Sequence, residues 1–168
     1  SSSFAYGIEL LASDNNTIIS NKVFTFTSSA WALFIDTTSD TNWIESNIFS
    51  TTETGTAAIL LNGVNTFNNT LLNNNLSSPF LEIQQTGSGL RQNYLIYNNS
   101  FGEIRWIDNN SDTSVTSGSF VRNMTLNVSN TKGLVLDDSI ISIKNNTIAF
   151  NNSAVGLFSK PSVGSPLI

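Results

Sequence analysis

The sequence contains neither cysteine nor histidine. Without cysteine there is no disulfide framework and no thiolate metal site, and the redox compartment stays open. Without histidine the chain lacks the usual general base, the usual partner of a catalytic nucleophile and the commonest metal ligand. These two absences remove the most frequent routes to catalysis and to transition-metal binding.

Charged residues are also scarce, at 11% of the 168 residues, against roughly 25% in an ordinary soluble protein. Lys and Arg together number 7 and are dispersed, so no basic patch is expected and nucleic-acid binding is disfavoured. No run of about 18 apolar residues occurs, so no membrane span is predicted. The chain begins at Ser1 without Met, so we expect that a targeting segment was removed or that a longer protein surrounds it.

Asn, Ser and Thr supply the polarity that charged residues usually provide, with 24, 25 and 18 occurrences. Hydrophobic residues reach 39%, which is enough for a buried core. The net charge of −5 and the small share of Lys and Glu are unlike a cytosolic surface. The composition therefore predicts an extracellular or cell-surface location.

Asn-x-Ser/Thr triplets without proline add to that expectation, because each is an N-glycan acceptor in a secreted chain. A chain this rich in Asn, Ser and Thr also produces several such triplets by chance. The candidate glycosylation sites are Asn15, Asn68, Asn75, Asn98, Asn109, Asn123, Asn127, Asn145 and Asn151.

A short internal repeat organises the chain. Six seven-residue frames align: IISNKVF at 18–24, WIESNIF at 43–49, TLLNNNL at 70–76, LIYNNSF at 95–101, FVRNMTL at 120–126 and SIKNNTI at 142–148. The second position of each frame predicts one buried column, formed by Ile19, Ile44, Leu71, Ile96, Val121 and Ile143. The seventh position predicts another, formed by Phe24, Phe49, Leu76, Phe101, Leu126 and Ile148.

A second strand signal precedes each frame, and most of these segments alternate apolar and polar residues. They lie at 7–11, 31–36, 57–62, 80–84, 103–108 and 132–137, and a seventh lies at 154–158. Helical spacing fits none of them well. Short strands repeated every 22–29 residues without helices predict an all-β solenoid of about six coils, stacked in parallel about 4.8 Å apart. We expect one domain over 1–158 and a tail or linker over 159–168, which holds two of the three prolines.

Asparagine recurs at the fourth or fifth position of every frame. These residues are Asn21, Asn47, Asn73 with Asn74, Asn98 with Asn99, Asn123, and Asn145 with Asn146. Asparagine tolerates the left-handed backbone of a turn, and its amide can hydrogen-bond the equivalent amide of the next coil. The sequence therefore predicts stacked asparagines at a turn between two sheets.

This repeat resembles the right-handed parallel β-helices of the pectate-lyase type. It is similar in particular to the Asn-rich repeats of the periplasmic copper-accessory family and of archaeal surface proteins. The resemblance covers roughly residues 5–158 and implies the right-handed coil. Such families include lyases, hydrolases, adhesins and surface-layer components, so it leaves the function open.

Candidate chemistry lies on the later coils. Asp108 and Asp137 end successive strands, with Asp112 and Asp138 near them in sequence, and the strand spacing predicts about 5–7 Å between the first two. That separation suits a retaining glycosidase pair or a calcium site with oxygen ligands. Asp36, Asn62 and Gln84 hold the same predicted position in earlier coils, so capping of a turn is the alternative.

Two longer segments, 84–94 and 108–119, predict a rim of adjacent loops suited to binding, or else tolerated insertions. Arg91, Arg105 and Arg122 would form a small positive spot or stand as isolated charges. The tryptophans suit sugar stacking or packing on a sheet. They are Trp31, Trp43 and Trp106, and Trp106 is the best candidate for a ligand-binding rim.

These observations favour a non-catalytic structural module of a surface layer, an adhesin or a filament, with no cofactor. The alternative is a module that binds or degrades polysaccharide, as a hydrolase or a lyase. Neither end of the repeat carries an amphipathic cap, and uncovered strand edges recruit other strands. We therefore expect copies of the chain itself, or neighbouring coils of a longer parent chain, as partners, together with attached glycans.

Overall fold

The computed structural model describes residues 4–78, apart from 37, 54–55, 63–65 and 67, and beyond residue 80 the backbone of the strands named below. This part of the chain is all-β, and its strands form three parallel sheets. Among the residues described, no helix is long and apolar enough to cross a membrane.

Every strand pairs with the strand three places away along the chain, so that successive strands pass from sheet to sheet. Sheet A contains β1 (Ala5–Leu11), β4 (Ala30–Asp36), β7 (Ala57–Leu61), β10 (Leu81–Gln85), β13 (Ile104–Ile107), β16 (Lys132–Asp137) and β19 (Val155–Lys160). Sheet B contains β2 (Thr17–Ile19), β5 (Trp43–Glu45), β8 (Thr70–Leu72), β11 (Tyr94–Ile96), β14 (Phe120–Arg122) and β17 (Ser142–Lys144). Sheet C contains β3 (Lys22–Thr25), β6 (Ile48–Thr51), β9 (Asn75–Ser77), β12 (Ser100–Phe101), β15 (Thr125–Ser129) and β18 (Thr147–Asn151).

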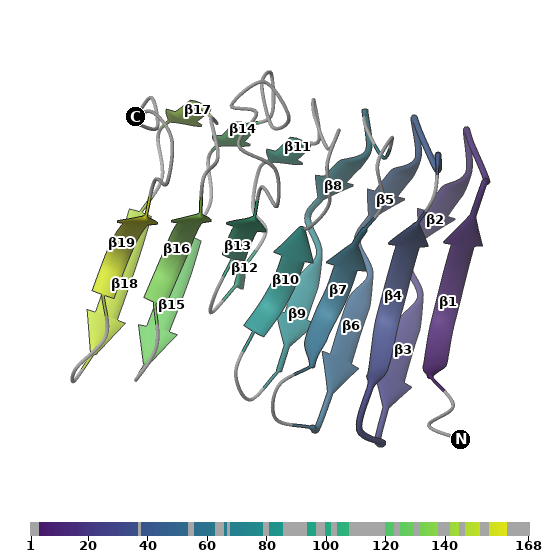
Figure 1. Ribbon diagram of the computed structural model, residues 1–168, viewed down its shortest axis with the longest axis horizontal. Helices are drawn as coiled ribbons and strands as arrows, with labels where there is room; N and C mark the ends of the chain where they lie inside the picture. The colour runs from purple at the N-terminus through teal and green to yellow at the C-terminus, as the bar shows by residue number, and fades with distance from the viewer. Residues whose placement is uncertain are drawn as a thin grey trace.

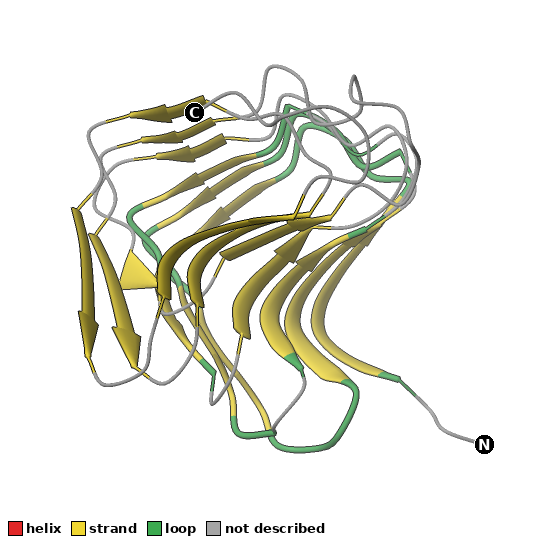
Figure 2. Cartoon of the chain, turned by 60° about the vertical axis from the view of Figure 1, so that its left-hand side comes forward, coloured by secondary structure: helices red, strands yellow, loops and turns green. Residues whose placement is uncertain are grey.

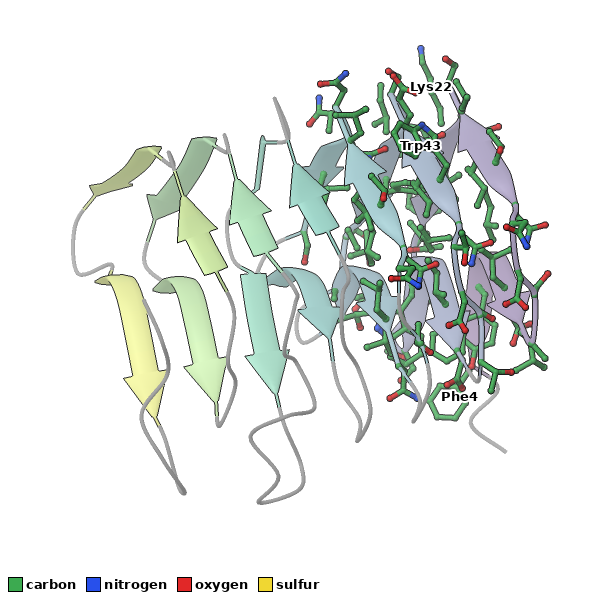
Figure 3. The ribbon with its side chains drawn as sticks, turned by 90° about the horizontal axis from the view of Figure 1, so that it is seen from above. Phe4, Lys22 and Trp43 are labelled. Atoms are coloured by element: carbon green, nitrogen blue, oxygen red, sulfur yellow. The ribbon has the colours of Figure 1, made fainter. Side chains whose placement is uncertain are left out.

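Three successive strands, one from each sheet, make a layer. The first layer is β1–β3, the second β4–β6 and the third β7–β9. Layers follow one another along the long axis from the N-terminus to the C-terminus (Figure 1), and the three sheets lie around a common interior (Figure 2). The strands of sheet A lie where the sequence predicts them, although β19 continues to Lys160, inside the predicted tail.

The interior is filled by apolar side chains that stack from layer to layer. Sheet B contributes Ile18, Ile44 and Leu71, which are paired in register and buried. Sheet C contributes Phe49 and Leu76, also in register and buried. Sheet A contributes fully buried pairs, Leu33 with Ile59 and Ile35 with Leu61. The stacks are what the sequence predicts, because parallel strands place equivalent residues directly above one another.

The predicted columns are nevertheless wrong at three members. Ile19 pairs with Glu45 and is 47% exposed, and Ile18 takes its place beside Ile44. Phe24 pairs with Ser50 and is 52% exposed. A slip of one residue along a strand moves every side chain to the opposite face of the sheet.

The third error lies in the fourth frame, where Leu95, and not Ile96, is paired with Leu71 and with Val121. Ile96 pairs with Leu72 instead. Three residues lie between β11 and β12, against two between β5 and β6, so the seven-residue frame is too short at this point.

Each of the first three layers turns twice through the same two-residue corner. The first residue has a left-handed backbone and the second is asparagine. At the first corner, between sheets A and B, φ is 58°, 59° and 58° at Asn15, Thr41 and Asn68. At the second corner, between sheets B and C, φ is 58°, 56° and 55° at Ser20, Ser46 and Asn73. Asparagine is among the residues that tolerate this conformation best, and it occupies three of these six positions.

The asparagines of the second corner form a hydrogen-bonded ladder, as the sequence predicts for Asn21 and Asn47. The Oδ1 atom of Asn47 accepts from the backbone N and from Nδ2 of Asn21, at 2.9 and 3.1 Å. Asn74 Oδ1 accepts from the same two groups of Asn47, at 3.0 and 3.1 Å. Asn47 Nδ2 also donates to the Ile18 carbonyl at 2.9 Å, so every polar atom of this buried side chain is used.

A second ladder runs along the first corner, through Asn16, Asn42 and Asn69. Asn42 Oδ1 accepts from the backbone N and Nδ2 of Asn16, at 2.9 and 3.0 Å, and Asn69 Oδ1 accepts from Asn42 at 3.1 and 2.9 Å. Asn42 Nδ2 reaches back to the Ser13 carbonyl at 3.1 Å. The repeat frames did not include these residues, so the first-corner ladder is a finding of the structure alone.

Candidate functional site

Three acidic residues of the first two layers, Asp14, Asp36 and Asp40, lie at the end of a sheet A strand or in the turn that leads from it into the first corner. The backbone N of Asp40 donates to Asp14 Oδ1 at 2.7 Å, and Asn62 Nδ2 donates to Asp36 Oδ1 at 3.3 Å. Ser39 Oγ donates to the Leu10 carbonyl at 3.1 Å. Each of these bonds joins one layer to the next. Asp14 thus binds the backbone of the neighbouring turn, and Asp36 binds the side chain of Asn62.

Asp36 and Asn62 do occupy equivalent positions, as the sequence predicts, because the preceding residues Ile35 and Leu61 are paired. Gln84 does not share that position. It pairs with Leu60 and with Arg105, two residues earlier in the register.

The predicted rim on the later layers is described only in part. Asp108, Asp112 and Asp138, and the segment 108–119, lie outside the described residues. Asp137, at the end of β16, is paired with Ile107 and Lys160, so the equivalent of Asp137 in the preceding layer is Ile107 and not Asp108.

Trp106 and two of the arginines can be placed by register. Trp106 pairs with Gln85 and with Leu136 in sheet A, in the column that begins with the buried residues Leu10, Ile35 and Leu61. Arg105 lies in β13 of sheet A and Arg122 in β14 of sheet B. The two arginines therefore belong to different sheets, while Arg91 lies outside the described residues.

Four aromatic side chains meet on sheet A in the first two layers. Tyr6 stacks on Phe34 with ring centroids 4.4 Å apart and an angle of 13° between the ring planes. Trp31 lies 5.8 Å from Tyr6 and 5.7 Å from both Phe34 and Phe4. Of the four, only Phe4 is mostly exposed, at 58%. Trp31 is thus packed on the sheet among other aromatics, which was one of the two roles predicted for it.

Tyr6 is the titratable group of this cluster. Burial among the neighbouring rings raises the pKa of Tyr6 above its ordinary value of 10.0, and the negative charges of Glu9 and Asp36 raise it further. A phenol with a raised pKa stays neutral at physiological pH and acts as a hydrogen-bond donor. The raised pKa of Tyr6 therefore does not favour the phenolate form that a general base would need.

Trp43 stands apart from the aromatic cluster, on the outer face of sheet B. It is 40% exposed, and its Nε1 donates to Glu45 Oε2 at 2.8 Å. The equivalent residues on the neighbouring strands are Thr17 and Thr70, so the ring has no aromatic neighbour in its register column among the first three layers.

The sequons within the described residues lie either at the first corner or in strands. Asn15 and Asn68 occupy the left-handed position of the first corner, where Asn15 is exposed and Asn68 is half-buried. Asn75 is exposed at the start of β9. Asn127 lies in β15 and Asn151 ends β18, whereas Asn98, Asn109, Asn123 and Asn145 lie outside the described residues.

The corner accounts for the Asn-Asn-Thr triplets without reference to glycans. The first asparagine takes the left-handed position, the second enters the ladder, and the threonine begins the strand in Asn15–Thr17 and in Asn68–Thr70. Asparagine, asparagine and threonine are favoured at these three places for separate physical reasons. Folding alone thus generates sequons at this corner.

Among the described residues, no three acidic side chains converge in a way that could hold a metal ion. The buried Oδ1 of the corner residue Asn73 has no hydrogen-bond partner among the described residues. The ladder asparagines Asn42 and Asn47 are hydrogen-bonded between layers, and the rings of the aromatic cluster face one another. What these residues do chemically is join layer to layer. Of the residues in the aromatic cluster, only Trp31 was singled out as a candidate from the sequence. The apolar residues at 4–6 and 31–34 were the sequence signal that could have indicated the rest of the cluster.

Comparison with known proteins adds no relative to this description. No family model matches the chain, and searches of curated proteins and of solved structures find no match.

Proposed function

We propose that the chain is a right-handed parallel β-helix of about six coils that serves as a non-catalytic structural module at the cell surface or outside the cell. A surface layer, an adhesin or a filament is the setting we propose for it. Its partners would be copies of itself or neighbouring coils of a longer parent chain, and it would need no cofactor.

The pair of asparagine ladders is the observation that carries this proposal. Asn42, Asn47, Asn69 and Asn74 are each no more than 1% exposed. The amides of Asn42 and Asn47 bond to the layer before and the layer after, and those of Asn69 and Asn74 bond to the layer before. Buried amides that are fully bonded make a stack rigid without creating a reactive group. Such corners suit a chain whose task is to keep a regular, extended shape.

The same corner sequence recurs beyond the third layer. Asn98 and Asn99 precede β12, which begins at Ser100, and Asn145 and Asn146 precede β18, which begins at Thr147. Ser100 pairs directly with Asn75 and with Thr125, and Thr125 pairs with Thr147. Ser100 and Thr147 therefore both lie in the register column of Asn75. This repetition supports a β-helix that continues through all six frames.

The low-charge, acidic composition supports the proposed extracellular location. N-glycans at exposed sequons such as Asn15 and Asn75 would fit that location. The corner chemistry also explains part of the sequon excess, so native material must be examined. Intact-mass measurement of protein from its natural source should show added hexose mass, and the mass of the bare chain would remove glycans from the proposal.

Binding of polysaccharide is the second candidate, and one observation favours it. Phe4 is exposed beside Trp31, and aromatic faces suit sugar rings. Against this, Tyr6 and Phe34 turn their faces to each other, so the cluster offers no continuous flat platform.

The test combines turnover and binding. The module should release no reducing ends from pectin or from neutral polysaccharides such as cellulose and chitin, and it should not be retained on insoluble cellulose or chitin. Turnover that disappears in Asp108→Asn or Asp137→Asn would overturn the structural function. Retention that disappears in Trp31→Ala while the fold persists would favour the carbohydrate-binding alternative.

A further inference from the structure

Exposed apolar side chains are concentrated in the first layer. Five of the six large hydrophobic residues that are strongly exposed in the described part belong to it or flank its strands, and only Trp43 lies in the second layer. Their exposure runs from 47% for Ile19 to 68% for Phe26. We call this set the apolar belt; its members are Phe4, Leu11, Ile19, Phe24 and Phe26.

The second layer carries polar residues at all five equivalent positions. The register pairs Leu11 with Asp36, Ile19 with Glu45 and Phe24 with Ser50. By continuation of the same register, Phe4 corresponds to Ser29 and Phe26 to Thr52. An edge position explains why these side chains are exposed, but it does not explain why they are apolar. Apolar side chains exposed to this extent are unfavourable in water, and together they mark a contact surface.

The edge inside this belt is also incomplete in its hydrogen bonds. β1, β2 and β3 each end their sheet. Within the described part, no donor reaches Oδ1 of Asn16 or Asn21, although the equivalent atoms of Asn42 and Asn47 each accept two bonds. The amides turn back on their own layer instead, as in the 3.0 Å bond from Asn21 Nδ2 to the Ile19 carbonyl.

The opposite end of the stack is not complementary to this belt. The register column of Ile19 runs through Glu45, Leu72, Ile96 and Arg122 and ends at Lys144. The column of Leu11 ends at Lys160, which is paired with Asp137. A head-to-tail contact would therefore set lysine positions against Ile19 and Leu11. Two first layers that face each other would match apolar with apolar.

We propose that the apolar belt and the edges of β1–β3 form an interface with a second copy of this chain, first layer against first layer about a twofold axis. This rests on the proposed structural function and names its contact. An axis through β1 pairs the two β1 strands in antiparallel fashion and sets β2 of one copy opposite β3 of the other. Ile19 then meets Phe24 of the second copy, and the strand edges cover each other.

Sedimentation velocity of the purified chain over a wide concentration range tests the proposal. The wild-type chain should form a closed dimer. The triple variant Leu11→Asp, Ile19→Glu, Phe24→Ser gives the belt the side chains of the second layer and should be monomeric, with an unchanged circular dichroism spectrum. Trp43→Thr is the matched control: it removes the exposed apolar side chain of the second layer and should leave the dimer intact.

A second measurement covers the case in which the triple variant does not fold. Because the chain has no cysteine, Ile19→Cys mixed with Phe24→Cys should give a disulfide-linked heterodimer under mild oxidation, and Trp43→Cys should not join either. A wild-type monomer at every concentration would overturn the proposal and leave the belt to another occupant, such as a preceding segment of a longer chain. Open-ended polymers or a dimeric triple variant would overturn it too. None of these results depends on polysaccharide turnover. The dimer interface can therefore be refuted without refuting the proposed structural function, and the reverse also holds.

Discussion

Replacing Asn47 by alanine removes the middle member of the second-corner ladder. Its side chain makes four hydrogen bonds: Oδ1 accepts twice from Asn21, and Nδ2 donates to Asn74 Oδ1 and to the Ile18 carbonyl, at distances between 2.9 and 3.1 Å. A buried hydrogen bond contributes about 1 kcal/mol net. Because Asn47 is only 1% exposed, water cannot replace the lost partners. We therefore expect the free energy of unfolding to fall by about 4 kcal/mol.

Asn47→Asp distinguishes the hydrogen bonds that the Asn47 side chain accepts from those that it donates. The aspartate keeps an oxygen for Asn21 but replaces both donated bonds with a carboxylate oxygen that faces the Ile18 carbonyl and Asn74 Oδ1. At neutral pH the loss should be at least as large as for alanine, since a charge is buried against two acceptors.

Urea denaturation followed by circular dichroism measures both changes, with midpoints compared at a constant slope. The control is Asn75→Ala, one residue beyond the ladder, where the side chain is exposed; its effect should stay within about 0.5 kcal/mol. Equal, small losses for Asn47→Ala and Asn75→Ala would refute the claim that the ladder stabilises the corner.

Three further outcomes follow from the core, the edge strand and the aromatic cluster. Ile44→Ala should lower the free energy of unfolding by about 2–5 kcal/mol, whereas Glu45→Ala on the opposite face should change it little; equal losses would show the register to be wrong. Gly7→Ala should destabilise the fold by about 1–3 kcal/mol, because the added Cβ would overlap Val23 Cγ1; Val23→Ala in the same chain should recover part of the loss, and a neutral Gly7→Ala would contradict the packing. The raised pKa of Tyr6 means that the folded state favours the neutral phenol, so this contribution is complete below pH about 10 and is lost as the pH rises through the folded pKa. Phenolate absorbance should show one late-titrating group that Tyr6→Phe removes, and a Tyr6 that ionises at or below its ordinary pKa would contradict the assignment.

The strands and the second-corner ladder could be predicted because both leave a local signature. Apolar alternation marks the strands of sheet A, and an asparagine at nearly constant distance from the strand marks the corner, as at Asn21 and Asn47. Which side chains of the first frame point into the interior could not be predicted in the same way. In the segment around Ile18 and Ile19 two isoleucines are adjacent, and hydrophobicity alone does not say which one points inward.

The information that decides the facing is carried by the pairing of layers. Alignment on the ladder asparagines, with Asn21 opposite Asn47, sets Ile18 opposite Ile44, as the structure shows. The aromatic cluster needs the same knowledge, because Tyr6 and Phe34 are far apart in sequence and stack only once β1 and β4 are in register.

Hydrogen exchange of the asparagine side-chain amides, followed by NMR, tests the central claim that buried ladders join the layers at both corners. The amides of Asn42 and Asn47 should exchange far more slowly than those of Asn15 and Asn75, because their Nδ2 groups are buried and bonded to the neighbouring layers. Exchange of Asn42 and Asn47 as fast as that of the exposed Asn15 amide would contradict the account.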